Sequence, residues 1–198
     1  MKQLKIFNLS INDPIPTATF FPLLSKEQCE QILTDFITDT PMTAKVNSRA
    51  DGKGIEASGK RSTLIHPVPY SEKSEWLYDL ISDRVASYNQ FGYQFNIMGV
   101  YSDIQLLEYP EGGHYDWHMD IGPGDAALRK LSVIIQLSDP SEYEGGETVF
   151  NTGTEHVLPK TQGQIAVFPS FVLHKVNPVT SGRRYALVLW FSGGERFK

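Results

Sequence analysis

Two histidines and one aspartate are the residues in this sequence best suited to chemistry. His118 and Asp120 are separated by one residue, and His174 follows much later. Two imidazoles and one carboxylate form the facial triad, which holds non-haem Fe(II) and leaves other coordination positions open. In a strand, residues two apart share a face, so His118 and Asp120 can reach one metal while Met119 is expected to point away into packing. A lone His-x-Asp pair is common, and spacing alone cannot prove that His174 joins it.

Arg184 adds a permanent positive charge to an apolar segment. Strand alternation places Arg184, Ala186, Val188 and Trp190 on one face. A buried guanidinium without a partner would be very costly. Its partner is either a structural carboxylate or the carboxylate of a ligand, which the guanidinium fork can bind with two hydrogen bonds. Iron with a carboxylate clamp indicates an oxygenase that uses an acidic co-substrate.

The remaining histidines are weaker candidates. His66 precedes a proline in an extended segment and His156 lies in a polar hairpin, so both are expected at the surface. His114 lies four residues before His118 and would share its face in a helix, but the proline and glycines within 110–113 disfavour a helix there. His114 therefore ranks below His174 as a ligand.

The composition is that of an ordinary globular protein. The chain has 198 residues, with 40% hydrophobic and 21% charged residues and a net charge of −5. The acidic balance and the lack of a long basic run disfavour nucleic acid as a partner. One cysteine, Cys29, cannot form an internal disulfide, so we expect a cytoplasmic protein. Neither a signal peptide nor a membrane helix is indicated.

Two helices and a series of short strands are expected, as a single domain over residues 1–198. Ser25 and Gln28 form a capping-box pattern that predicts a helix over 25–38, with Cys29 packed in the core. A second helix is expected over 71–90, capped by Ser71 or Ser74. The predicted strands cover residues 18–22, 93–99, 102–109, 130–138, 147–150, 164–168 and 184–191. This order predicts a mainly β fold of the α+β class, with helical support over about 1–92 and a jelly-roll core, or double-stranded β-helix, over about 93–198.

Residues 43–62 form a long polar stretch rich in Gly, Lys and Ser. It is either an irregular surface loop or a lid that closes over an active site.

Four ordered motifs resemble the 2-oxoglutarate- and Fe(II)-dependent dioxygenases, most closely the prolyl 4-hydroxylase-like branch with its bacterial and phage relatives. They are the runs 109–120 (YPEGGHYDWHMD), 131–140 (LSVIIQLSDP), 144–150 (EGGETVF) and 174–184 (HKVNPVTSGRR). The resemblance covers about residues 104–190, roughly half the chain.

The resemblance implies a role for each matching residue. It assigns Fe(II) to His118, Asp120 and His174, the 2-oxoglutarate site to Arg184, Tyr109, Thr148 and Gln136, and the substrate site to Tyr115, Arg129 and Trp190. Core packing is the alternative for the three aromatic residues. Gln136 departs from the family pattern, since some relatives have a tyrosine there that touches 2-oxoglutarate. The glutamine amide either replaces that donor or leaves it absent.

The implied activity is O2-dependent hydroxylation of a C–H bond, most simply of a prolyl residue in a peptide or protein, with release of succinate and CO2 and with ascorbate as a reductant. A free amino acid or another side chain is the alternative substrate. Three other classes of protein stay open: a zinc hydrolase with Glu147 or Glu111 as base, a non-catalytic jelly-roll binding module, and a nucleic-acid demethylase, which the acidic balance disfavours. The sequence does not indicate an oligomeric state.

Overall fold

The structure, a computed structural model, describes residues 18–44, 46–47, 54–55 and 59–197. Its helices are α1 (Lys26–Phe36), α2 (Glu75–Tyr88), the π-helix η1 (Asn89–Tyr93) and the 3-10 helix η2 (Gly124–Leu128). Its strands are β1 (Thr19–Pro22), β2 (Met42–Thr43), β3 (Val46–Asn47), β4 (Gly54–Ile55), β5 (Arg61–Ser62), β6 (Leu64–Val68), β7 (Gly99–Val100), β8 (Ile104–Tyr109), β9 (His114–His118), β10 (Arg129–Gln136), β11 (Tyr143–Gly145), β12 (Thr148–Asn151), β13 (Glu155–Val157), β14 (Gln164–Pro169), β15 (Leu173–Val176), β16 (Val179–Gly182) and β17 (Arg184–Ser192).

Two antiparallel sheets form the body of the protein. The major sheet has the order β1-β14-β10-β17-β8-β6-β2, with β7 on β17, and the minor sheet has the order β13-β12-β15-β9-β5. Ile134 and Phe168 of the major sheet and Phe150 of the minor sheet belong to one buried apolar cluster. The sheets therefore face each other across a shared core, which confirms the predicted jelly roll.

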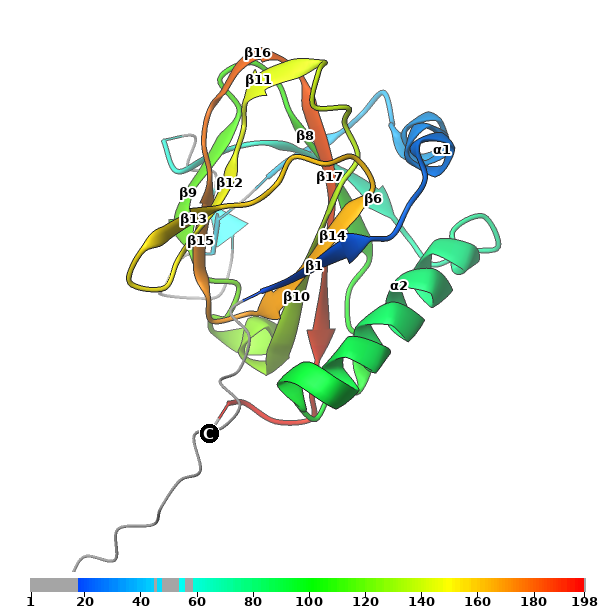
Figure 1. Cartoon of the computed structure of the whole chain (residues 1–198), viewed down its shortest axis with the longest axis vertical. Helices are drawn as coiled ribbons and strands as arrows, with labels where there is room; N and C mark the ends of the chain where they lie inside the picture. Colours follow the sequence, from blue (N-terminus) through cyan, green and yellow to red (C-terminus); the bar gives the residue numbers. More distant parts are fainter. Residues whose placement is uncertain (1–17, 45, 48–53, 56–58, 198) are drawn as a thin grey trace, which may run out of the picture.

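The helices cover the outer face of the major sheet. Ile135 and Leu187, each one residue away from a side chain of the inter-sheet cluster, belong instead to a large cluster with Ile32 of α1 and Ile81 of α2. Figure 1 shows both helices beside the major sheet, on the side away from the minor sheet. The two-residue alternation of β10 and β17 thus builds two separate apolar layers. No helix in the described part of the chain is long and apolar enough to span a membrane.

Helix α1 begins as its capping pattern predicts. The Ser25 side chain accepts from the Gln28 backbone N–H, and the Gln28 side chain accepts from the Ser25 backbone N–H. Cys29 is fully buried, and burial raises the pKa of its thiol to about 11. The thiol is therefore a protonated core group, as expected.

The strand predicted over residues 93–99 is wrong. α2 continues into η1, and only Gly99 of this stretch is in a strand, as the first residue of β7. The Asn89 side chain accepts from the backbone N–H of Phe95 and donates to its carbonyl, which occupies the groups that a ladder would need. Gln94 adopts φ 55°, a left-handed conformation that interrupts an extended chain.

The surface position expected for His66 is also wrong, whereas His156 is exposed as expected. His66 is 1% exposed. Its Nδ1 accepts from the Thr38 backbone N–H at 2.9 Å, so its Nε2 donates to Glu108 at 2.9 Å. Arg183 binds the other oxygen of Glu108 at 2.8 Å. The buried polar side chains of His66 in β6 and Glu108 in β8 are thus hydrogen-bonded to each other and to groups beside them.

Candidate metal and co-substrate site

Strands β9 and β15 bring the two candidate histidines together. His118 and His174 are register partners across these strands. Asp120 follows β9, and its backbone N–H donates to the Ser170 carbonyl at 2.9 Å. One ligand atom from each of the three side chains lies within 4.8 Å of the others. His114 lies outside this cluster, and its Nδ1 bonds instead to the Gly112 carbonyl at 3.0 Å.

Both imidazoles present the same nitrogen to the aspartate. His118 Nδ1 lies 2.8 Å from the Asp116 carbonyl and His174 Nδ1 lies 3.0 Å from the Val172 carbonyl, so each Nδ1 carries the proton. Each Nε2 then offers a lone pair, at 3.7 Å from one oxygen of Asp120. This donor set suits a divalent metal held on one face.

The protonation states also suit a metal. Burial and the neighbouring His174 lower the pKa of His118 to about 3, so this imidazole is neutral at pH 7. Burial raises the pKa of Asp120, but the two histidines and the Ser132 hydroxyl together lower it by more. The net shift of this pKa is therefore downward. A neutral imidazole and an ionised carboxylate are the forms that bind metal.

Ser132 orients the carboxylate. It is fully buried in β10, and its hydroxyl donates to Asp120 Oδ2 at 2.6 Å. The Ser170 hydroxyl lies 3.0 Å from it. A polar residue inside the apolar run 131–135 is the signal that could have marked it in the sequence.

Ser132→Ala is expected to weaken metal affinity by about 10-fold, since outer groups that orient a ligand contribute roughly 10- to 100-fold. Isothermal titration of Mn(II) into the metal-free protein would measure this. Ser181→Ala, an exposed serine of β16, is the matched control. Equal Mn(II) affinities of Ser132→Ala and Ser181→Ala would contradict the role of Ser132 in orienting the metal ligand Asp120.

A β-bulge places Tyr115 on the same side as His118. Along β15 one residue lies between His174 and Val176, whereas along β9 two residues lie between their partners His118 and Tyr115. The extra residue restores the inward direction of the phenol. The Tyr115 and His118 rings are stacked, with centroids 3.4 Å apart. Burial raises the pKa of Tyr115, against the opposing influence of Arg61, so the hydroxyl stays protonated.

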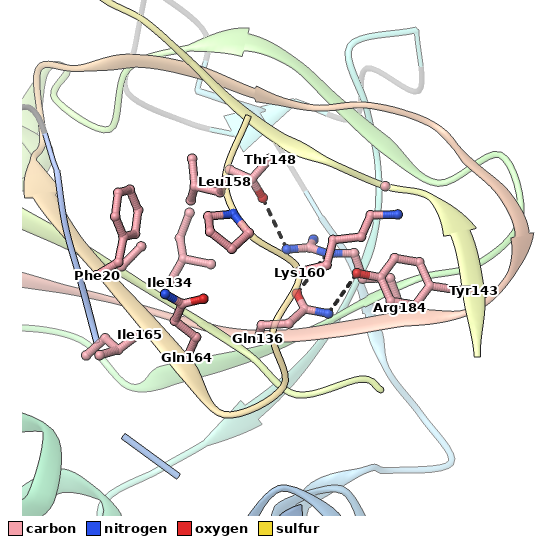
Figure 2. A pocket seen from close by; sticks show the side chains of 13 residues that line it. Phe20, Ile134, Gln136, Tyr143, Thr148, Leu158, Lys160, Gln164, Ile165 and Arg184 are labelled. Carbon is pink, nitrogen blue, oxygen red and sulfur yellow. Dashed lines mark hydrogen bonds between the residues drawn. The ribbon is translucent and has the colours of Figure 1, made fainter. Parts of the chain in front are cut away.

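Arg184 is a buried cation held by neutral groups. It is 3% exposed. Its Nε donates to Gln136 Oε1 at 3.1 Å and its Nη2 to Thr148 Oγ1 at 3.2 Å. Figure 2 shows these bonds, with Gln136 also bonded to Tyr143. In the described part of the chain no carboxylate forms an ion pair with Arg184.

Tyr109 lies beside the guanidinium. Arg184 and Tyr109 are register partners across β17 and β8, and the Arg184 Cζ lies 5.0 Å from the centre of the Tyr109 ring. Thr148 approaches from β12 of the minor sheet. The sheets thus clamp the arginine between them. The Gln136 amide donates to Tyr143 at 3.0 Å, so this glutamine supports Arg184 from behind the cavity wall.

One large open cavity joins the histidine cluster to Arg184. Its volume is about 1420 Å³, beyond the roughly 300–1,000 Å³ of ordinary small-molecule pockets. The inward residues of β17 line it, and they are Arg184, Ala186, Val188 and Trp190. Arg129 also lines it, with its guanidinium 3.7 Å from the centre of the Trp190 ring.

The packing expected for Met119 is wrong. Its side chain is 50% exposed and lies at the edge of the cavity. β9 ends at His118, so the residues that follow leave the alternation of the strand.

The predicted lid over 43–62 falls partly on residues 45, 48–53 and 56–58, outside the described part. Of its described residues, Thr43, Gly59, Lys60 and Arg61 line the cavity. Arg61 was not anticipated, because a single arginine in a polar stretch has no distinguishing pattern. Tyr143 was missed for a similar reason.

Residues 104–192 match the sequence model of the 2OG-Fe(II) oxygenase superfamily. A PKHD-type hydroxylase of Pseudomonas putida (strain W619) is 39% identical over 89 residues, which are 41% of this chain and 39% of the relative. A PKHD-type hydroxylase of Hyphomonas neptunium is 46% identical over 88 residues, which are 40% of this chain and 38% of the relative. The match thus spans about two fifths of the length of these relatives.

Solved prolyl hydroxylases share the fold. A Pseudomonas putida prolyl-4-hydroxylase superposes with a TM-score of 0.65 at 19% identity, over 89% of this chain and 92% of that one. The viral collagen prolyl hydroxylase of Paramecium bursaria Chlorella virus-1 gives 0.66 at 18% identity, over 90% and 97%. A Trichoplax adhaerens prolyl hydroxylase in complex with a hypoxia inducible factor peptide gives 0.69 at 16% identity, over 89% and 83%.

Proposed function

Residues 104–192 resemble the 2OG-Fe(II) oxygenase superfamily, and we propose that this chain is an oxygenase of that kind, a hydroxylase of a C–H bond dependent on 2-oxoglutarate and O2. The reaction consumes substrate, O2 and 2-oxoglutarate and yields the alcohol, succinate and CO2. Bound Fe(II) supplies the activation of O2 that this chemistry requires.

The observation that carries the proposal is a buried guanidinium without a carboxylate in the described part of the chain, in the same cavity as a His-Asp-His cluster. Such a charge is costly unless a ligand supplies the missing partner. The distal carboxylate of 2-oxoglutarate does so. Arg184 and the three metal ligands line the same cavity, so the rest of the co-substrate would lie between them.

Each residue has a defined task in this proposal. His118, Asp120 and His174 hold Fe(II), with Ser132 fixing the carboxylate. Arg184 and the Tyr109 hydroxyl bind the far end of 2-oxoglutarate, and Thr148 and Gln136 fix the guanidinium.

The substrate we propose is a prolyl residue in a peptide or protein. The volume of the cavity exceeds what a co-substrate fills, and several solved proteins with a similar fold are prolyl hydroxylases, one of them bound to a peptide. Tyr115, Arg129 and Trp190 wall the space beside the metal ligands and would contact this residue. A free amino acid is the second candidate. The single, buried thiol favours a reducing cytoplasm.

A zinc hydrolase fits the site less well. Glu147 pairs with Lys160 at 3.2 Å and with Asn177 at 3.2 Å, and among the described residues neither Glu147 nor Glu111 lines the cavity. No described glutamate is therefore placed to activate a metal-bound water, and Arg184 would keep an unpaired charge.

Anaerobic addition of Fe(II) and 2-oxoglutarate is expected to produce a weak visible charge-transfer band, and O2 is then expected to yield succinate. Absorption spectroscopy and succinate quantification check this without a primary substrate. Addition of Zn(II) in place of Fe(II) is the control and should give neither signal. A protein that binds Fe(II) but shows no band with 2-oxoglutarate would contradict the proposal.

A further inference from the structure

The charges that line the cavity are unbalanced once the proposed ligands are in place. The charged side chains there are Asp116, Asp120, Lys60, Arg61, Arg129 and Arg184. The charges of a ferrous ion, Asp120, dianionic 2-oxoglutarate and Arg184 cancel. Among the described residues, three cationic side chains and one carboxylate are then left, so the described lining on the substrate side of the cavity carries a positive excess.

Arg61 is one of these cations. It lies in β5, directly opposite Tyr115 of β9, and its guanidinium carbon is 4.5 Å from the centre of the Tyr115 ring. Its Nε is buried and has no hydrogen-bond partner, and no carboxylate of the described residues forms an ion pair with it. A half-buried guanidinium stacked on an aromatic ring keeps its outer donors free for a ligand.

Arg129, at the start of β10 in the major sheet, lines the same cavity as Tyr115. One of its terminal nitrogens donates to the Asp120 carbonyl at 3.2 Å while its plane covers Trp190. Its other donors have no carboxylate partner within the described part of the chain. Arg61, Arg129 and Tyr115 all line the same cavity.

We propose that Arg61 and Arg129 form a carboxylate-binding subsite beside Tyr115, and that Arg61 makes the enzyme prefer substrates with an acidic group near the target C–H bond. The proposal rests on the proposed hydroxylase function and specifies its substrate class. The carboxylate can come from an acidic side chain of a peptide or from a free α-carboxylate. Either one would receive paired hydrogen bonds from a guanidinium while Tyr115 stays stacked on His118.

Binding of matched peptides tests the subsite without turnover. Mn(II) takes the same oxygen and nitrogen ligands as Fe(II), so Mn(II)-loaded protein with 2-oxoglutarate can be titrated with fluorescein-labelled proline peptides. One pair differs by aspartate or asparagine next to the proline, and another by a C-terminal carboxylate or amide. The wild type is expected to bind the acid of at least one pair about tenfold more tightly, as for a charged hydrogen bond in a partly buried site.

Variants of Arg61 separate charge recognition from packing. Arg61→Gln is expected to reduce the acid preference to less than about threefold, and Arg61→Lys to retain an intermediate preference because it keeps the charge. Arg84→Gln, an exposed arginine of α2, should behave as wild type. The pair that responds identifies the source of the carboxylate.

Three results would overturn the inference. They are equal affinities of the wild type for acid and amide peptides, an equal decrease of both affinities in Arg61→Gln, and no binding of any peptide. None of these affects the charge-transfer band with 2-oxoglutarate, which needs no primary substrate. Failure of the acidic subsite is therefore distinguishable from failure of the hydroxylase function.

Discussion

Asp120→Ala is expected to abolish succinate production and to weaken metal affinity by more than about 100-fold. The change removes the only carboxylate of the His-Asp-His cluster, and even an outer residue that orients a ligand contributes roughly 10- to 100-fold. It also leaves the Ser132 hydroxyl without its acceptor. Mn(II) titration and succinate release measure the two effects.

Asp79→Ala is the matched control, because Asp79 is an exposed carboxylate on α2 outside the cavity. It should retain the metal affinity and turnover of the wild type. Retained turnover with unchanged metal affinity in Asp120→Ala would contradict the role assigned to this aspartate.

Arg184→Gln is expected to raise the KM for 2-oxoglutarate by about 10- to 100-fold. A hydrogen bond to a charged group contributes about 1.5–3 kcal/mol, and about 1.4 kcal/mol corresponds to a factor of ten. The metal ligands are untouched, so Mn(II) affinity should not change. Steady-state kinetics with varied 2-oxoglutarate measures the effect.

Thermal unfolding gives a second measurement of the same pairing. A ligand that binds only the folded protein raises its stability, so 2-oxoglutarate with Mn(II) should raise the Tm of the wild type and much less that of Arg184→Gln. Arg183→Gln is the control, because Arg183 directly precedes β17 and pairs with Glu108. It should lower the Tm yet keep the shift caused by 2-oxoglutarate. An unchanged KM for 2-oxoglutarate in Arg184→Gln would contradict the proposal that Arg184 binds this co-substrate.

Much of the fold is predictable because local patterns and long-range packing agree. The capping box of α1 and the alternation of β10 and β17 follow directly from the sequence. The strand prediction for 93–99 fails because the apolar residues of this stretch resemble a strand pattern. Its conformation is set instead by hydrogen bonds to the Asn89 side chain and by the left-handed backbone of Gln94. The predicted surface position of His66 is wrong because its partner Glu108 is distant in sequence and is brought close only by the pairing of β6 and β8.

The candidate site is predictable to the extent that its residues follow simple alternation. Arg184 and Trp190 lie on the predicted face of β17. Tyr115 does not follow this alternation, because it lies three positions before His118 and only the bulge in β9 turns both rings inward. Ser132 and Arg61 acquire meaning from what they contact, which no linear spacing reveals.

The exposed thioether of Met119 sets a limit on the durability of such an enzyme. It lies at the cavity edge between two metal ligands in sequence, whereas the one thiol is fully buried. When O2 is activated without a target in place, the accessible sulfur is the more vulnerable of the two to stray oxidant. Its sulfoxide is polar and bulkier, and it would stand at the rim that substrate must pass. Turnover without substrate would therefore leave a lasting chemical mark on the protein itself.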